Sequence, residues 1–275
     1  MNVVELTKSL ISCPSVTPNN EGVLDLLQKE LTDMGFTCNR YLFSDTDTPD
    51  VDNLFAKIGS GAPHLCFGGH TDVVPVGDEN AWNSNPFEAT EKNGKLYGRG
   101  ASDMKSAIAA FVSAVREYLE NNEMKGTISL LITNDEEGPA INGTRKVLEE
   151  IYKNGEKIDS CLVGEPTCPS NLGEMIKIGR RGSITTTIKV SGKQGHVAYP
   201  EWTLNPINPL TSILNTLCNL ELDKGTEDFP PSNMEIVKIA SSEGATNIVP
   251  QTSTGTFNIR YNINHTKESL QSMIN

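Results

Sequence analysis

Short apolar strands that alternate with helices run through the first 179 residues, and this pattern limits the fold more than any other feature. Apolar residues at three- and four-residue spacing predict helices over residues 3–12, 22–34, 104–120 and 142–152. Apolar and β-branched runs predict strands over residues 36–43, 53–58, 64–68, 127–133 and 160–163. We therefore expect an α/β fold with a mostly parallel central sheet flanked by helices.

The pattern changes after about residue 179. Residues 183–190 alternate cleanly and are rich in β-branched side chains, as in a strand with one exposed face. A helix is expected over 206–220, strands over 234–240 and 254–261, and a further helix from 266. This β-α-β-β-α order predicts a ferredoxin-like α+β unit without its last strand. We expect two domains, residues 1–179 and 180–275.

Charge and composition exclude several classes of function. The 275 residues carry a formal net charge of -12, which disfavours binding to nucleic acid or to anionic membranes. The N-terminus lacks a secretory signal, and no run approaches the ~20 apolar residues of a membrane helix. The six cysteines are scattered without a CxxC pair, which favours free thiols. A cytoplasmic protein is expected, and the charge does not exclude a small-molecule substrate that is itself anionic.

Four short acidic or histidine-bearing segments lie next to expected elements: three follow a strand, and one leads into the helix that begins at residue 104. They are GGHTDVVP (68–75), GRGASDMK (98–105), TNDEEG (133–138) and VGEPT (163–167). In an extended chain, residues i and i+2 point to the same side, so Asp72 could orient the imidazole of His70. The alternative for this pair is a core histidine beside an exposed aspartate.

The remaining acids allow similar alternatives. Asp103 either caps the helix that follows it or bridges two cations. Glu136 and Glu137 diverge as neighbours, so one can bind a metal while the other faces a water; otherwise they form a solvated turn. Glu165 is a ligand or a surface acid. Since ligands gather at the carboxyl ends of parallel strands, the combination predicts a site for two metal ions and a general base.

Taken together, these motifs resemble the M20 family of dinuclear zinc amidohydrolases and peptidases. The resemblance runs along the whole chain and includes IKIGRRGS (176–183), GKQGHVAYP (192–200) and TNIVP (246–250). The GRRGS and QGHVAYP runs within these segments favour the desuccinylase branch of the family over the acetylornithine deacetylase branch. The family pattern implies a catalytic domain with an inserted lid domain, residues 180–275.

The resemblance also implies roles for individual residues. Zinc ions, or cobalt in their place, would be held by His70, Asp103, Glu137 and Glu165. Asp72 would orient His70, Glu136 would be the general base, and the Asp103–Met104 peptide would be cis. His196 would reach the active site of a partner subunit in a homodimer formed through the lid. Substrate would be contacted by Arg180, Ser183, Tyr199, Asn247 and Arg260.

The expected reaction is hydrolysis of N-succinyl-LL-2,6-diaminopimelate to succinate and LL-2,6-diaminopimelate in lysine biosynthesis. The family pattern needs one more histidine ligand, which none of His64, His70, His196 and His265 matches. We therefore expect both domains to be incomplete at the C-terminus, with an incomplete second zinc site and little or no activity. The alternatives are another deacylase of the family, an aminopeptidase, or an inactive metal-binding and dimerisation fragment.

Overall fold

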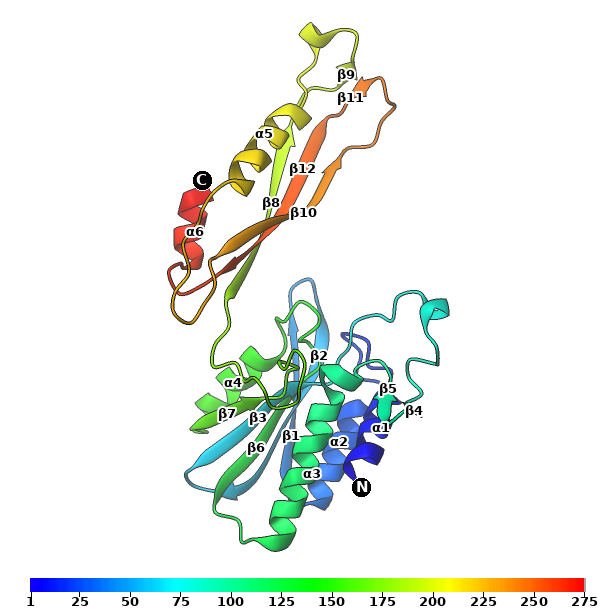
Figure 1. Ribbon diagram of the computed structural model, residues 1–275, viewed down its shortest axis with the longest axis vertical. Helices are drawn as coiled ribbons and strands as arrows, with labels where there is room; N and C mark the ends of the chain where they lie inside the picture. The colour runs from blue at the N-terminus through cyan, green and yellow to red at the C-terminus, as the bar shows by residue number, and fades with distance from the viewer. Residues whose placement is uncertain (275) are drawn as a thin grey trace. The chain divides into compact units, whose positions relative to one another are not determined.

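The chain divides into two compact units. The structure, a computed structural model, describes residues 1–274, and the units are Met1–Leu172 and Gly173–Asn275 (Figure 1). The division lies between residues 172 and 173, whereas the sequence predicted it between 179 and 180. No helix within residues 1–274 is long and apolar enough to cross a membrane.

A five-stranded mixed sheet forms the centre of the first unit. Its strands, in the order β1-β2-β6-β3-β7, are β1 (Thr37–Asp45), β2 (Thr48–Ser60), β6 (Gly126–Thr133), β3 (His64–His70) and β7 (Ser160–Val163). β3 is parallel to β6 and β7, but β2 is antiparallel to both β1 and β6. The expectation of a mostly parallel sheet was therefore wrong for half of the pairings. Only two residues separate β1 from β2, which is too short for a parallel crossover.

Helices cover both faces of this sheet (Figure 1). They are α1 (Val3–Ile11), α2 (Val23–Asp33), α3 (Ser106–Asn121) and α4 (Thr144–Lys153). Leu130 and Ile132 of β6 pack in the core formed with α1, α2 and α3. Leu131, between them in the chain, packs in a second core with Val147 and Ile151 of α4. Successive strand residues point to opposite faces, so an unbroken apolar run suits a strand buried on both sides.

Smaller elements complete the first unit. The β4 (Thr90–Lys92) and β5 (Lys95–Tyr97) pair, which the sequence did not predict, follows the short helix η1 (Glu79–Ala81). The turn η2 (Ala101–Lys105) leads directly into α3. This turn carries the GRGASDMK motif to the edge of the sheet where β3 ends, since η2 contacts β3.

The second unit is a three-stranded antiparallel sheet with two helices. The strands β10 (Asn233–Ser241), β12 (Thr252–Tyr261) and β8 (Gly182–Ser191) lie in that order. The helices are α5 (Ile207–Cys218) and α6 (Lys267–Ile274), and their core includes Leu214, Phe257 and Leu270. The strands and helices follow one another as predicted. The short pair β9 (Gly195–His196) and β11 (Ile248–Val249), with the helix η3 (Pro200–Trp202), was not predicted.

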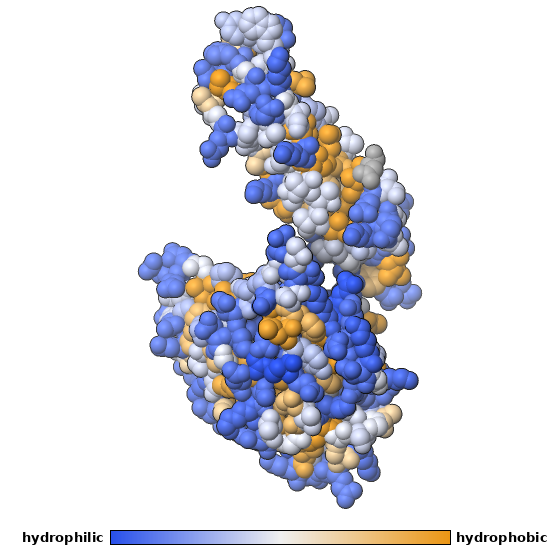
Figure 2. All heavy atoms as spheres, turned by 180° about the vertical axis from the view of Figure 1, so that it is seen from behind, coloured by the Kyte–Doolittle hydropathy of each residue, from blue (hydrophilic) through white to orange (hydrophobic). Residues whose placement is uncertain are grey.

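The face of the molecule in Figure 2 is mostly hydrophilic, with hydrophobic patches between the hydrophilic side chains. Exposed apolar residues include Leu162 and Val163 of β7, and Val237 and Ile239 of β10. β7 is an edge strand whose four residues are all exposed. Among residues 1–274, β3 is the only strand that pairs with it in this sheet.

Candidate metal centre

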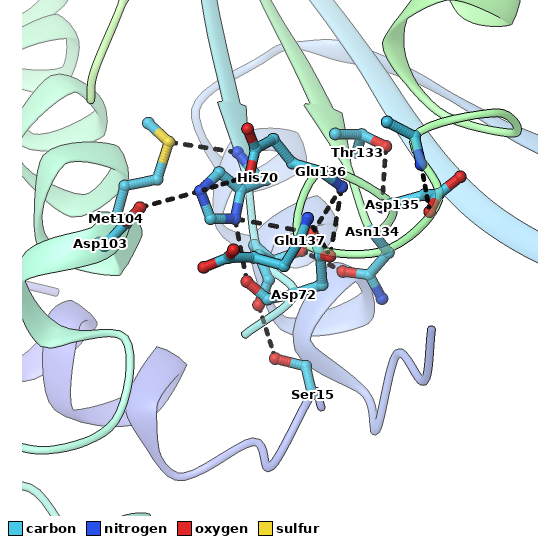
Figure 3. Close-up of polar contacts among 12 residues, drawn as sticks. Ser15, His70, Asp72, Asp103, Met104, Thr133, Asn134, Asp135, Glu136 and Glu137 are labelled. Atoms are coloured by element: carbon cyan, nitrogen blue, oxygen red, sulfur yellow. Dashed lines mark hydrogen bonds and ion pairs between the residues drawn. The ribbon is translucent and has the colours of Figure 1, made fainter. Parts of the chain in front are cut away.

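Three neighbouring parallel strands end at the same edge of the sheet, and the candidate site lies there. His70 is the last residue of β3, and Glu165 follows β7 after one glycine. Glu136 and Glu137 follow β6, and Asp103 enters from η2. Figure 3 shows His70 between Asp103 and the segment that carries the two glutamates.

The imidazole of His70 is the centre of two groups of possible ligands. Its Nε2 atom lies 3.0 Å from Oδ1 of Asp103 and 3.6 Å from Oε1 of Glu165. These three residues form one group, and His70 with Glu136 and Glu137 forms the other; the ligand atoms in each lie within 4.8 Å of one another. His70 is 1% exposed, so its imidazole is held firmly by the surrounding protein. It is the metal-ligand side chain that the two groups share.

Hydrogen bonding sets the tautomer of His70. Its Nδ1 atom lies 2.9 Å from the backbone carbonyl oxygen of Asp72 and 3.5 Å from that residue's carboxylate. In the neutral imidazole, a proton on Nδ1 is donated to the carbonyl, and the Nε2 lone pair then faces Asp103 and Glu165. Burial lowers the pKa of His70, but hydrogen bonds to Asp72 and the charges of Asp72 and Glu136 outweigh it and raise the pKa to about 9.

The carboxylate of Asp72 has a second task that the sequence did not indicate. It is fully buried and accepts hydrogen bonds from the backbone N–H of Glu136, at 3.2 Å, and of Glu137, at 3.0 Å. One aspartate thus fixes His70 through its carbonyl and the two glutamates through its side chain. Its position two residues after His70 allows both contacts.

The electrostatics of the site suit a cation. Asp103, Glu136, Glu137 and Glu165 surround a single imidazole. Burial raises the pKa of Glu137, and the charges of Asp103 and Glu136 raise it further against the opposing effect of His70. One imidazole with several carboxylates is a donor set used for divalent metal ions such as zinc. The residues present therefore fit a metal centre.

The turn that presents Asp103 is anchored by buried groups. Lys105 is fully buried, and its Nζ atom donates to the carbonyl oxygens of Leu10 and Cys13, each at 2.9 Å. Burial lowers the pKa of Lys105 to about 8. Gly100 has a φ of +77°, and a Cβ there would lie 2.7 Å from Val73. The Asp103–Met104 peptide is cis, as the family resemblance implied.

A further aspartate shapes the loop after the glutamates. Asp135 is buried, and its carboxylate accepts hydrogen bonds from the backbone N–H groups of Ala140, Ile141 and Asn142. Sequence reasoning missed both Asp135 and Lys105. The turn signal Gly138–Pro139 just after Asp135 could have indicated its role, because aspartate often satisfies the amides of a following turn.

The predicted substrate-binding residues of the second unit do not form one cluster. His196 and Asn247 lie on and beside the β9–β11 pair, with Asn247 Nδ2 3.3 Å from His196 Nε2, and the Tyr199 ring lies 5.9 Å from the His196 ring. Ser183 and Arg260 are register partners at the start of β8, and the exposed Arg180 precedes them. Since β9 follows the end of β8, the two groups lie at opposite ends of that strand.

Comparisons with known proteins found matches along most of the chain. The model of peptidase family M20/M25/M40 matches residues 66–266. The chain is 53% identical over 267 residues to succinyl-diaminopimelate desuccinylase of Parvibaculum lavamentivorans, covering 97% of this chain and 67% of the relative. The enzyme of the same name from Rhodospirillum centenum is 52% identical, with 98% and 70% covered.

Solved structures show the same fold at low sequence identity. An M20 family metallo-carboxypeptidase, Sso-CP2 of Sulfolobus solfataricus, superposes with a TM-score of 0.80 at 18% identity, covering 100% of this chain and 74% of that one. YXEP of Bacillus subtilis, described as a dinuclear metal-binding peptidase from the M20 family, gives 0.61 at 17% identity, covering 98% and 66%.

Proposed function

The chain belongs to peptidase family M20/M25/M40, and we propose that it is a metal-dependent amidohydrolase that acts on N-succinyl-LL-2,6-diaminopimelate. The products are succinate and LL-2,6-diaminopimelate, an intermediate of lysine biosynthesis. The observation that carries the proposal is the convergence of His70 with four carboxylates at one sheet edge. The substrate rests on relatives above 50% identity that carry the desuccinylase name.

Two divalent ions, zinc or cobalt, are proposed for the site. His70 and Glu165 would hold the first, Glu137 would hold the second, and Asp103 would be shared by both. The chemistry that such ions supply is Lewis-acid activation of water and of the amide carbonyl. Among residues 1–274, His70 is the only histidine in either candidate group, so we expect the second ion to be held more weakly than the first.

Glu136 is the proposed general base. Its side chain is half-exposed, and its Oε2 atom lies 3.9 Å from His70 Nε2, so it borders the ligands while remaining open to a substrate. It takes the proton of the attacking water and returns it to the leaving amine. The Asp72 carboxylate keeps Glu136 and Glu137 in place through their backbone amides.

The second unit is proposed to handle the substrate and to form a homodimer as a lid domain. His196 donates to the oxyanion of the tetrahedral intermediate in a partner subunit, assisted by Asn247 and Tyr199. Arg180 and Arg260, with Ser183, bind the succinyl carboxylate, because a guanidinium offers paired N–H donors to it. We propose a cytoplasmic enzyme whose turnover in this chain alone is low, since the second ion is weakly held.

Competing substrates test this function. The chain, loaded with zinc or cobalt, is incubated for hours with N-succinyl-LL-2,6-diaminopimelate or with N-acetylornithine, and the released acid is measured by mass spectrometry. Succinate release that exceeds acetate release supports the proposal. Faster cleavage of acetylornithine would replace it with the deacetylase alternative.

A matched pair of variants tests the mechanism. Glu136→Gln should bind metal like the wild type in calorimetry but lose turnover, by a factor of ~10²–10⁴ typical of a general base. Glu149→Gln changes an exposed helical glutamate on α4 and should leave turnover unchanged. Equal turnover in Glu136→Gln and wild type would remove Glu136 from the mechanism, whereas metal binding without any turnover in the wild type would favour the inactive fragment.

A further inference from the structure

Two cysteines outside the metal centre face each other across neighbouring strands. Cys66 on β3 and Cys161 on β7 are register partners in the parallel ladder, so both side chains project from the same face of the sheet. Neighbouring strands lie about 4.8 Å apart, which is within the Cα separation of about 4.4–6.8 Å that disulfides span. Neither cysteine is in a disulfide.

The two thiols have opposite surroundings. Cys66 is 1% exposed and packs with Leu131 and Val147, whereas Cys161 is exposed on the edge strand. Sγ of Cys161 lies beside Gly68, where an added Cβ would be in ordinary van der Waals contact with it at 3.5 Å. Solvent therefore reaches one sulfur of the pair directly, while the other is enclosed beside it.

The pKa values of the two thiols are shifted in opposite directions. The neighbouring Cys66 side chain, together with the Gly68 backbone, outweighs burial and lowers the pKa of Cys161 to about 7. The neighbouring Cys161 side chain, together with burial, raises the pKa of Cys66. An accessible thiolate beside a protonated thiol is the arrangement of an attacking and a resolving cysteine.

We propose that Cys66 and Cys161 form a peroxide-responsive thiol pair whose disulfide links β7 covalently to β3. The link would lie four residues before His70 on one strand and four residues before Glu165 on the other. It would tie the exposed edge strand that leads to Glu165 to the buried strand that carries His70. The modification therefore acts on the frame of the metal centre without using its ligands.

The oxidation balances with hydrogen peroxide as the oxidant. The Cys161 thiolate attacks one peroxide oxygen, the O–O bond breaks, and the hydroxide that leaves takes a proton to form water. The sulfur of Cys66 then attacks the sulfenic sulfur of Cys161. The S–O bond breaks, and the departing hydroxide takes the Cys66 proton as a second water. Two thiols lose two electrons, and one peroxide gains them.

Peptide mapping of the wild-type chain tests the proposal directly. The chain is treated with hydrogen peroxide, the remaining thiols are alkylated, and the tryptic peptides are sequenced by mass spectrometry without reduction. Cleavage after Lys157 and Lys177 leaves Cys161 and Cys168 in one peptide, so fragment ions must locate the link. We expect two of the six thiols to disappear and a link between Cys66 and Cys161 within one chain.

Matched variants separate the pair from its neighbours. Cys168→Ser should keep the link, and Cys161→Ser, which changes an exposed side chain, should abolish it and leave Cys66 reduced. The proposal is overturned if oxidised wild type holds Cys66 as a free thiol, with Cys161 as a sulfinic acid or joined to another cysteine. It is equally overturned if Cys161→Ser still loses two thiols through Cys66. These outcomes do not depend on hydrolase activity.

Discussion

Replacing Asp72 by asparagine should loosen the segment that carries both glutamates. The Asp72 side chain is fully buried and accepts from the amides of Glu136 and Glu137, with its Oδ1 atom 3.5 Å from His70 Nδ1. Asparagine has nearly the same shape but only one acceptor oxygen. The NH₂ group of the asparagine is a donor, so it would face another donor: either a backbone N–H or the ring N–H of His70.

The magnitude follows from these contacts. A hydrogen bond to a charged group contributes about 1.5–3 kcal/mol to stability. Asparagine keeps one acceptor without the charge, so the loss should be equivalent to about one such bond, ~2 kcal/mol. Because Glu137 is positioned by this carboxylate, the binding of a second metal ion should weaken more than the binding of the first. The hydrogen bond between His70 Nδ1 and the backbone carbonyl oxygen of Asp72 is retained.

Tryptophan fluorescence can follow the first unit alone. The chain has two tryptophans, Trp82 and Trp202, one in each unit. In a Trp202→Phe background, urea unfolding in the presence of a chelator reports the stability of the first unit around Trp82. Calorimetric titration of the folded variants with zinc then measures the two binding events.

An exposed aspartate provides the control. Asp50→Asn, at a solvent-exposed position of β2, should change the stability by less than about 0.5 kcal/mol. The reasoning is refuted if Asp72→Asn unfolds like this control and binds both zinc ions as the wild type does. That result would mean that the glutamate segment is held by other contacts, such as those of Asp135.

Three further outcomes follow from the structure. Zinc at about a hundredfold excess over its dissociation constant should stabilise the wild type by ~2.7 kcal/mol, and His70→Asn should remove this gain in thermal unfolding. Burial raises the pKa of Asp223, but hydrogen bonds from Ser232, Asn262 and Gly225 outweigh it and hold the pKa well below its usual range. The ionised carboxylate therefore stabilises the second unit above about pH 4, and this stability is lost as the pH falls. Asp223→Asn should unfold more easily at pH 7. Its free energy of unfolding, measured in urea at a series of pH values, should fall less steeply at acid pH. Lys105→Met leaves two buried carbonyl oxygens without their donor, and each unpaired oxygen should cost about 1–3 kcal/mol of stability. Removing the buried ammonium group offsets part of this cost. The net effect should be a lower urea midpoint.

The helices and strands of the first unit could be predicted because burial places apolar residues at regular intervals in the sequence. The run around Leu131 is apolar at every position because the sheet is covered on both faces. The spacing of apolar residues does not indicate which strands are neighbours in the sheet. The antiparallel pairings of β2 therefore escaped prediction, since they depend on a two-residue turn and on β6 inserting between β2 and β3.

The candidate site shows the same division at the level of single residues. His70, Asp103, Glu136, Glu137 and Glu165 could be selected because each follows a strand or a glycine-rich turn, and the structure gathers them into two groups. Their individual roles remain predictions. Lys105 could not be selected, because its partners are backbone carbonyl oxygens of a distant segment, and Asp135 has only the following Gly138–Pro139 turn as a signal. Backbone acceptors leave no pattern in the side-chain sequence.

The amino-acid sequence by itself indicated the kind of chemistry, because ligand-type side chains that follow several apolar strands favour a shared site at the carboxyl ends of parallel strands. It also determined the family, through motifs that extend along the whole chain. Only the tertiary structure decided how His70 is shared between two ligand groups, and how Asp72 divides its two contacts. It also placed Cys66 opposite Cys161. Such details depend on strand register and on distances of a few ångströms, which long-range packing sets.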